Sequence, residues 1–217
     1  MRKIIYVVIL VAIIASVIGC SSKTEENPTL YLTLVNKTHR LPNNWESGIE
    51  LDIANNSLNE TSLIEHKTYA SYLELQEALS KKGIRIELDS VYRSVEEQQA
   101  IWDSWASDPE LGEEYCEKYL AVPGFSEHHT GLAVDIFIMK GDLEIRDNDD
   151  MIADTEDFAV IHELMPEYGF ILRYPKGKED ITGYAYEPWH LRYVGSKEVA
   201  TTITEQGLTL EEYLGAN

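Results

Sequence analysis

The sequence predicts a single domain that combines α-helices with β-strands. Its 217 residues suit one domain with a buried core, and 44% hydrophobic and 26% charged residues are typical of globular proteins. Apolar residues alternate with a period of two in short runs such as 132–138, which indicates strands. They recur at helical spacing in longer segments such as 62–82, so both kinds of element are expected.

The predicted helices are marked by start and stop signals. Segment 62–82 ends at Lys81-Lys82-Gly83, where two cations lie near the negative end of a helix dipole. A helix from Val95 to about Ser107 follows a capping box formed by Ser94 and Glu97. A helix over 157–168 stops at Gly169. Further helices are expected at the end of segment 108–121 and over 196–214.

Strands are predicted where apolar residues alternate or run continuously, at 30–35, 84–88, 132–138, 170–172 and on both sides of Glu187. Two acidic segments connect these elements. The first, 45–56, is expected to be extended along the surface, and the second, 140–154, is expected to be an exposed loop.

Residues 1–20 predict the signal peptide of a bacterial lipoprotein. A basic start is followed by the almost wholly apolar segment 4–18 and by Gly19-Cys20, a pattern similar to a lipobox. Cleavage would leave Cys20 as the lipidated first residue of a tether that ends at residue 29, ahead of a domain over 30–217. An uncleaved anchor is the alternative, because the apolar run is near the lower length limit for a membrane span. Both place the domain outside the cytoplasm.

The net charge argues against nucleic acid and anionic membranes as partners, and the two cysteines argue against a disulfide and a cysteine nucleophile. With 38 acidic and 18 basic residues the net charge is -20, which argues against nucleic acid or an anionic membrane surface as a charge-driven partner. If Cys20 is acylated, Cys116 has no disulfide partner and is expected to pack as a small hydrophobe. The alternative of a Cys116 nucleophile lacks a neighbouring base or positive field in the sequence.

Asp135 lies in the middle of the predicted strand at 132–138. A carboxylate is uncommon in a strand and costly to bury without a cation or hydrogen-bond donors. A metal ion would satisfy it, with His128 or His129 as a nitrogen ligand and Gly131 allowing a sharp turn between them. The alternative at this point is an aspartate bonded only to a neighbouring loop.

A second stretch, 186–194, favours the metal site. It places His190 at the head of another alternating run and Glu187 three residues before it. Two histidines and one aspartate leave the fourth tetrahedral position open, as catalytic zinc requires. A glutamate that is not a ligand could then deprotonate the attacking water.

Arg93 lies at a predicted junction between a strand and a helix, where side chains commonly converge on sites. Its planar fork suits a carboxylate, and a structural ion pair with an acidic residue is the alternative. Gln98, on the first turns of the same helix, could face the same pocket or be an ordinary surface residue.

With these motifs in order, the chain resembles the zinc D-alanyl-D-alanine carboxypeptidases of the VanY type. Three motifs carry the resemblance: Tyr92-Arg93-Ser94-x-x-x-Gln98, Ser126-x-His128-x-x-Gly131-x-Ala133-x-Asp135 and Glu187-Pro188-Trp189-His190-x-Arg192-Tyr193-Val194-Gly195. The likeness covers nearly everything after the tether.

The resemblance implies an α+β fold, with helices packed around a small antiparallel sheet and zinc on its concave face. It implies that His128, rather than His129, is a Zn²⁺ ligand together with Asp135 and His190, and that Glu187 is the catalytic acid and base.

The resemblance also implies substrate roles. Arg93 would stabilise the scissile carbonyl oxygen or hold a substrate carboxylate, and Ser126 and Gln98 would position the terminal residue. Val91 departs from the small residue that is common before Tyr-Arg-Ser, and it is expected to narrow the pocket beside Arg93.

The expected function is removal of the terminal D-Ala from peptidoglycan stem peptides by a monomer that is lipid-anchored outside the bacterial cytoplasm. Two alternatives within the class are an L,D-carboxypeptidase acting on tetrapeptide stems and a D,D-dipeptidase. An inactive, metal-bearing module that binds cell-wall peptides is the alternative from another class. An inactive module is expected to lack the catalytic base, whereas Glu187 is present in this sequence.

Overall fold

The computed structural model of the protein describes residues 29–110 and 112–216. The predicted signal peptide, Cys20 and all but the last residue of the predicted tether lie outside these ranges. Within them, no helix is long and apolar enough to cross a membrane.

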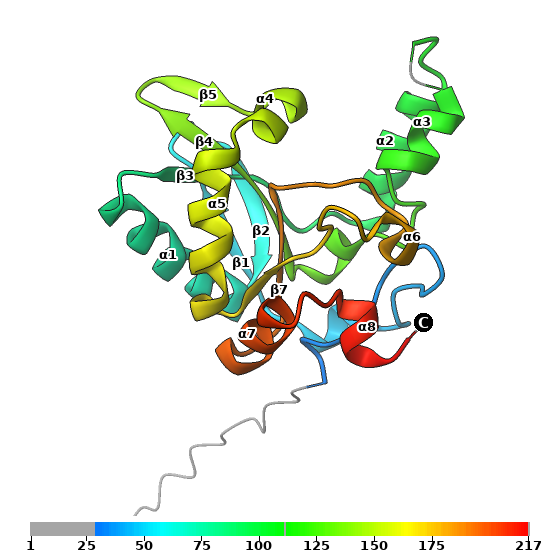
Figure 1. The fold of residues 1–217 in the computed structure, drawn as a ribbon. Helices are drawn as coiled ribbons and strands as arrows, with labels where there is room; N and C mark the ends of the chain where they lie inside the picture. The colour runs from blue at the N-terminus through cyan, green and yellow to red at the C-terminus, as the bar shows by residue number, and fades with distance from the viewer. Residues whose placement is uncertain (1–28, 111, 217) are drawn as a thin grey trace, which may run out of the picture.

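An antiparallel sheet of five strands forms the centre of the molecule (Figure 1). Its order is β3 (Arg85–Ser90), β4 (Ala133–Lys140), β7 (His190–Tyr193) and β6 (Phe170–Leu172), and β5 (Leu143–Ile145) pairs with the end of β4. Strand β4 pairs on both edges and most of its side chains on both faces are buried, which is why its sequence is apolar at successive positions. The α+β class with a small antiparallel sheet is confirmed.

The pairing register brings separate sequence motifs together. Asp135 on β4 lies opposite His190 on β7 and, across the other edge, opposite Ser90 on β3. The register of β3 and β4 shifts between Leu88 and Ser90, which is a bulge at the end of β3. The chain leaves the sheet there toward Arg93, so all three motifs meet at one end of β4.

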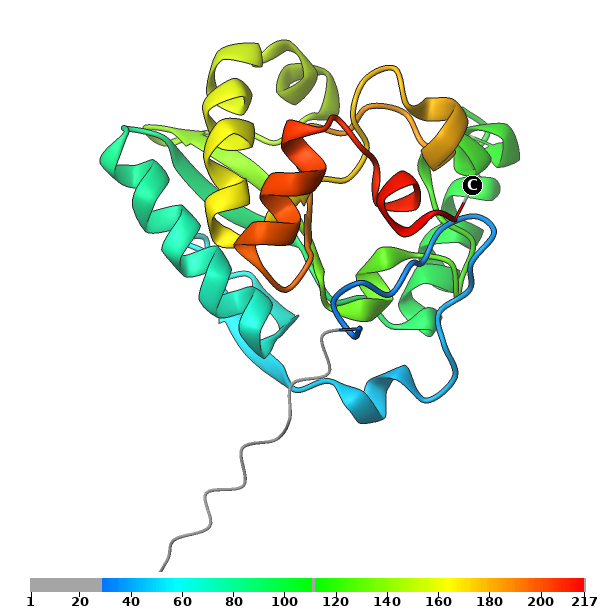
Figure 2. The same cartoon turned by 60° about the horizontal axis from the view of Figure 1, so that its bottom comes forward.

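Helices cover the sheet on one side. Figures 1 and 2 show α1 (His66–Lys81), α5 (Thr155–Leu164) and α7 (Lys197–Glu205) on this side, with η3 (Met165–Tyr168) in contact with all three. A hairpin of β1 (Leu51–Asn55) and β2 (Thr61–Glu65) leads into α1. The main core is buried between these helices and the strands.

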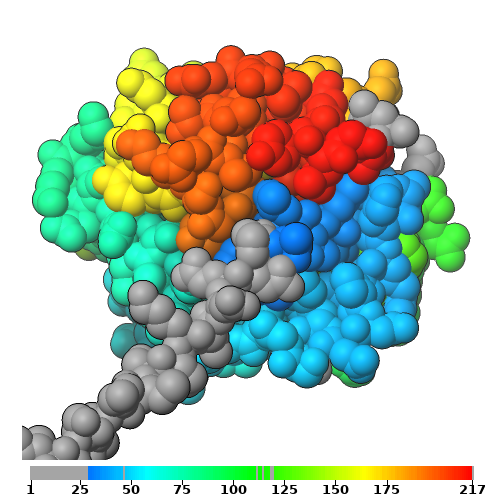
Figure 3. Space-filling model, turned by 90° about the horizontal axis from the view of Figure 1, so that it is seen from below, coloured from blue at the N-terminus to red at the C-terminus, as the bar shows by residue number. Residues whose placement is uncertain are grey.

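Seven further helices complete the described part of the chain. They are η1 (Trp45–Gly48), α2 (Val95–Ala106), α3 (Gly112–Tyr119), η2 (Glu127–Thr130), α4 (Asn148–Ala153), α6 (Glu179–Thr182) and α8 (Leu210–Leu214). Figure 3 shows the first described residues against the C-terminal residues on one face. A hydrogen bond of 3.0 Å from Asn36 Nδ2 to Glu211 Oε1 joins the two segments.

Some predicted elements were wrong. Residues 29–32 form a turn rather than a strand, and segment 45–56 contains η1 and β1. The start of segment 62–82 belongs to strand β2, and no strand precedes Glu187 among the described residues of its segment. Segment 140–154 folds into β5 and α4, because Gly141 (φ 68°) turns the chain after β4 and the Asp147 side chain caps α4. Tertiary pairing outweighed the acidic composition there.

The predicted capping box at the start of α2 is confirmed. The Ser94 hydroxyl accepts a hydrogen bond from the backbone N–H of Glu97, and the Glu97 carboxylate accepts one from the backbone N–H of Ser94. Two otherwise unsatisfied donors at the helix start are thereby paired, directly after Arg93.

We expect Ser94→Ala to lower the free energy of unfolding by about 1 kcal/mol, because the Glu97 backbone N–H loses its acceptor. Urea denaturation followed by circular dichroism measures this difference. Ser104→Ala within the same helix is the control and should leave the free energy nearly unchanged. Equal effects of the two substitutions would contradict the capping role.

Candidate metal centre and active site

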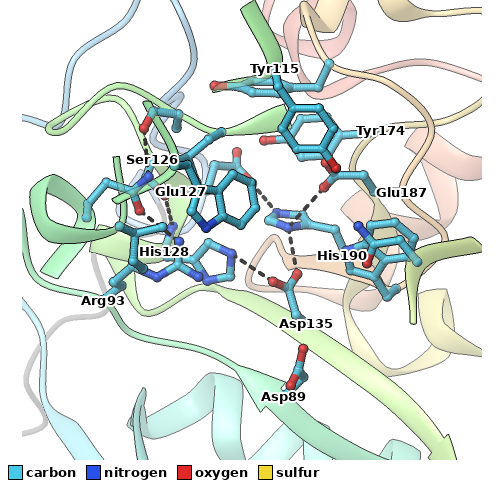
Figure 4. A pocket seen from close by; sticks show the side chains of 18 residues that line it. Asp89, Arg93, Tyr115, Ser126, Glu127, His128, Asp135, Tyr174, Glu187 and His190 are labelled. Atoms are coloured by element: carbon cyan, nitrogen blue, oxygen red, sulfur yellow. Dashed lines mark hydrogen bonds and ion pairs between the residues drawn. The ribbon is translucent and has the colours of Figure 1, made fainter. Parts of the chain in front are cut away.

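A cleft with a cavity volume of about 230 Å³ lies where the three motifs meet (Figure 4). Its polar lining includes Arg93, Ser126, His128, Asp135, Glu187 and His190. Aromatic side chains line much of the remainder: Trp105, Tyr115, Tyr174, Tyr184 and Trp189. The cleft therefore joins a cluster of charges to an apolar wall.

His128, Asp135 and His190 converge in this cleft. His128 Nε2 lies 3.1 Å from Asp135 Oδ2, and His190 Nδ1 lies 2.9 Å from Asp135 Oδ1. One potential ligand atom from each residue lies within 4.8 Å of the other two. The predicted convergence of these three side chains is therefore present in the structure.

Local backbone geometry places His128. The helix η2 ends at Gly131, which has φ 70°, and a Cβ atom there would lie 3.2 Å from the Glu65 backbone nitrogen. Only glycine adopts this conformation in so tight a space without strain. The turn directs the chain from η2 into β4, which carries Asp135.

Hydrogen bonds distinguish His128 from its neighbour His129. His128 Nδ1 lies 2.6 Å from the carbonyl oxygen of Val91, so that nitrogen carries the proton and leaves Nε2 free to bind a metal. Both ring nitrogens of His129 are engaged, since Nδ1 contacts the Arg93 carbonyl at 2.6 Å and Nε2 accepts from the Gly124 N–H at 3.0 Å. His129 is a structural residue.

Val91 acts through its backbone. Its side chain is buried in the main core and does not line the cleft, so the expectation that it narrows the pocket beside Arg93 was wrong. The side chain packs in the main core, while the carbonyl contacts His128 Nδ1 at 2.6 Å.

The three side chains fit a metal ion. Asp135 Oδ1 is buried and has no hydrogen bond of good geometry, although His190 Nδ1 lies 2.9 Å away, and a cation between these two atoms would satisfy it. Burial raises the pKa of Asp135, but the neighbouring His128 and His190 imidazoles hold that pKa well below its usual range. Two imidazole nitrogens and one carboxylate oxygen are a donor set that zinc takes with an open fourth position.

Glu187 lies beside this cluster. Its Oε2 atom is 3.8 Å from His190 Nδ1 and its side chain is mostly buried. Burial raises the pKa of Glu187 to about 8, with Asp135 and Glu127 adding to the rise and His190 opposing it. A carboxyl group that titrates near neutral pH can accept and return a proton under physiological conditions.

The guanidinium group of Arg93 lines the cleft and is held in place by two hydrogen bonds. Its Nη1 donates to Gln98 Oε1 at 2.8 Å and its Nη2 donates to Ser90 Oγ at 2.7 Å. The Gln98 amide donates in turn to the Ala121 carbonyl at 2.7 Å. Arg93 forms no ion pair with a carboxylate of the described ranges, so the alternative of a structural ion pair is not supported.

Gln98 and Ser126 line the cleft but are engaged with the protein. Gln98 is fully buried between Arg93 and Ala121. The Ser126 hydroxyl accepts from the His128 backbone N–H at 3.3 Å and caps η2. Both therefore support Arg93 and His128 directly. Their predicted contacts with substrate stay a prediction.

Cys116 is a free and buried thiol whose pKa is raised by burial. A raised pKa disfavours the reactive thiolate. This agrees with the prediction that Cys116 packs as a small hydrophobe.

Four buried charges next to the cleft were missed by sequence reasoning: Glu127, Arg173, Arg192 and Glu211. Their side chains are each at most 3% exposed and form ion pairs with one another. The hydrophobic periodicity of their segments did not predict that these four side chains are buried. Two signals were available in the motifs: Glu127 lies between two residues of the His128 motif, and Arg192 belongs to the His190 motif.

Comparisons with known proteins agree with this geometry. Residues 61–196 match the family model described as "VanY: D-alanyl-D-alanine carboxypeptidase". The chain is 38% identical over 187 residues to the bifunctional D-Ala-D-Ala dipeptidase and D-Ala-D-Ala carboxypeptidase VanXYC of Enterococcus gallinarum, which covers 84% of this chain and 92% of that protein.

Two solved structures are also similar. One is a mutant of the vancomycin-resistance D,D-pentapeptidase VanY from a VanB-type resistance cassette, in complex with Zn(II), with 33% identity, a TM-score of 0.70 and coverage of 85% of this chain and 99% of that one. The other is the LD-carboxypeptidase LdcB, with 38% identity, a TM-score of 0.73 and coverage of 88% of each chain.

Proposed function

Because the chain belongs to the VanY family of D-alanyl-D-alanine carboxypeptidases, we propose that it is a zinc-dependent hydrolase that removes the terminal D-Ala from peptidoglycan stem peptides. The observation that carries this proposal is the convergence of His128, Asp135 and His190 within 4.8 Å, with Glu187 beside them. The relatives supply the substrate class and the metal, since one was solved with Zn(II).

The proposed ligands are His128 through Nε2, His190 through Nδ1, and the Asp135 carboxylate. Bound zinc would lower the pKa of a coordinated water to about 7 and polarise the scissile carbonyl. Glu187 accepts the proton of the attacking water and returns it to the departing amine of D-Ala. Burial favours both transfers, because it raises the pKa of Glu187 above that of an exposed glutamate and so makes this carboxylate a better proton acceptor.

Arg93 supplies the second positive charge at the site. Its fork is fixed by Ser90 and Gln98, so the guanidinium needs no reorganisation when charge develops on the carbonyl oxygen. A substrate carboxylate is the other group it could hold, since guanidinium forks match carboxylates.

Mass spectrometry of purified stem peptides tests the proposal. The protein is treated with a chelator, then restored with zinc, and each sample is incubated with a pentapeptide ending in D-Ala-D-Ala. We expect loss of one D-Ala only with the zinc-restored protein. An intact pentapeptide after incubation with zinc-loaded protein would contradict the proposed D,D-carboxypeptidase activity, and a binding module would be favoured only if the tetrapeptide and free D-Ala-D-Ala also stayed intact.

L,D-carboxypeptidase activity is a second candidate, because the similarity to LdcB is as strong as that to VanY. The two activities differ in the residue before the scissile bond. Parallel incubations with the pentapeptide, the tetrapeptide and free D-Ala-D-Ala separate D,D-carboxypeptidase, L,D-carboxypeptidase and dipeptidase activities by the product each yields.

Zinc binding is expected to release protons at pH 7, between about one and two per ion. Without metal, burial lowers the pKa of His190, but Asp135 and Glu127 raise that pKa to about 10, and the pKa of Glu187 is about 8. Both groups therefore hold a proton at pH 7. His190 must lose its proton to bind zinc. The positive charge of the zinc also lowers the pKa of Glu187, so that Glu187 releases part of its proton as well.

Calorimetry of zinc binding in two buffers of different ionisation enthalpy measures this release. The apparent zinc affinity should rise with pH between pH 6 and 8, because fewer protons remain to be displaced. In the metal-free protein, the stability contributed by Glu187 and His190 is fully present below their unfolded-state pKa values and is lost as pH rises through about 8 and about 10. A binding enthalpy independent of the buffer would contradict this account.

The N-terminal sequence supports a lipid anchor at Cys20 and action outside the cytoplasm. We expect Cys20→Ala to shift the protein from the membrane fraction, which immunoblotting of fractionated cells would show. Membrane retention of this variant would favour the uncleaved anchor.

A further inference from the structure

The buried charges Glu127, Arg173, Arg192 and Glu211 form one continuous chain of contacts that ends on His190. We call them the buried charge chain. Two carboxylates and two guanidinium groups make it neutral as a whole, which lowers the cost of burying it.

Glu127 divides its two carboxylate oxygens between different partners. Oε1 accepts from Arg173 Nε at 2.7 Å and from Arg192 Nη1 at 2.7 Å. Oε2 faces His190 Nε2 at 3.5 Å. The carboxylate is thus fixed by two cations on one side. On its other side it faces the His190 imidazole, as Figure 4 shows.

The two arginines are themselves anchored. Arg173 donates to both oxygens of Glu211 on α8, at 2.9 and 2.6 Å. Arg192 donates to the Tyr31 and Thr33 carbonyls at 3.1 and 2.8 Å. Both guanidinium groups are therefore held in place, and Glu127 has little freedom to turn away from His190.

The position of Glu127 determines which nitrogen of His190 carries the proton in the neutral ring. An acceptor opposite Nε2 favours the proton there, which leaves a lone pair on Nδ1. Nδ1 is the atom that faces Asp135 at 2.9 Å within the candidate metal cluster. In zinc sites generally, a carboxylate that accepts the second N–H of a ligating histidine fixes the ring and strengthens the ligand.

We propose that Glu127 is a positioning residue of the metal site, which accepts the Nε2 proton of His190 and so directs the Nδ1 lone pair toward the metal. This inference rests on the proposed zinc function. It assigns a purpose to the buried charge chain, which holds Glu127 in the orientation that His190 requires.

Glu127→Gln tests the proposal sharply because glutamine keeps the shape but has only one acceptor oxygen. Two N–H donors face the Oε1 position, so the amide oxygen stays there and the NH₂ group faces His190 Nε2. That donor favours the proton on Nδ1, the wrong nitrogen for binding metal. We expect the zinc dissociation constant, measured by chelator competition on the whole purified protein, to rise about 10- to 100-fold.

Glu211→Gln is the matched control. It makes the same chemical change in the same chain of contacts and also leaves one buried cation uncompensated, but Glu211 does not contact His190. Both variants should be less stable than the wild type in urea. Only Glu127→Gln should lose zinc affinity to the stated extent. Equal zinc affinities of the two variants would overturn the proposal.

Nitrogen-15 NMR of the imidazoles in the zinc-loaded wild type provides a readout that does not depend on either variant folding. We expect His190 to carry its proton on Nε2, and a proton on Nδ1 would overturn the proposal. Failure of the wild type to bind zinc would instead contradict the proposed function, so the two failures are distinguishable.

Discussion

Glu187→Gln is expected to lower kcat for D-Ala release by about 10²- to 10⁴-fold, because the amide can neither accept the proton of the attacking water nor return it to the leaving amine. Glutamine preserves the size of a mostly buried side chain that lies 3.8 Å from His190. Zinc content should stay at the wild-type level, since Glu187 is not a proposed ligand. Steady-state kinetics on the pentapeptide, with metal analysis of the same samples, measures both quantities.

Glu205→Gln is a suitable control, because Glu205 is exposed at the end of α7. It should leave kcat unchanged. The acid and base role of Glu187 would have to be abandoned if Glu187→Gln released D-Ala at the wild-type rate with zinc bound.

Arg93→Lys is expected to lower kcat/KM by about 10²- to 10³-fold. Lysine keeps the positive charge but lacks the fork that lets Arg93 bind Gln98 and Ser90 and still face the cleft. The charge is therefore no longer fixed where the carbonyl oxygen develops its negative charge. Zinc affinity should change little, because Arg93 is not a proposed ligand.

The matched control for Arg93→Lys is Arg85→Lys on β3, where the side chain is half exposed and 3.7 Å from Glu87. The same exchange there should leave kcat/KM unchanged. If Arg93→Lys lowered only the melting temperature and left kcat/KM intact, Arg93 would be a structural residue.

The sequence was sufficient to predict which three side chains converge as the candidate metal cluster. Asp135 interrupts an apolar strand, and a buried carboxylate in that position demands a partner. The motif spacing of the family then favoured His128 over His129, and the structure gives the physical reason in the hydrogen bonds that occupy both nitrogens of His129. A carboxylate that is costly to bury, within an otherwise apolar strand, was therefore enough to predict that a partner group lies beside it.

Features that depend on distant partners could not be predicted. The segment 140–154 is acidic, yet β5 forms there because β4 offers an edge to pair with. The buried charge chain joins Glu127 to Glu211 through Arg173, and Glu211 looks like an ordinary surface residue in its own segment. Only the fold shows that Arg173 and Arg192 are fully buried.

The buried charge chain ties the stability of the site region to α8. Every proposed metal ligand precedes Glu211 in the sequence, so a protein truncated before α8 would still carry all three ligands. It would lack the carboxylate that pairs with Arg173, and Glu127 would be shared between two cations with only one of them anchored. Truncation before α8 is therefore expected to destabilise the fold without removing a single proposed ligand.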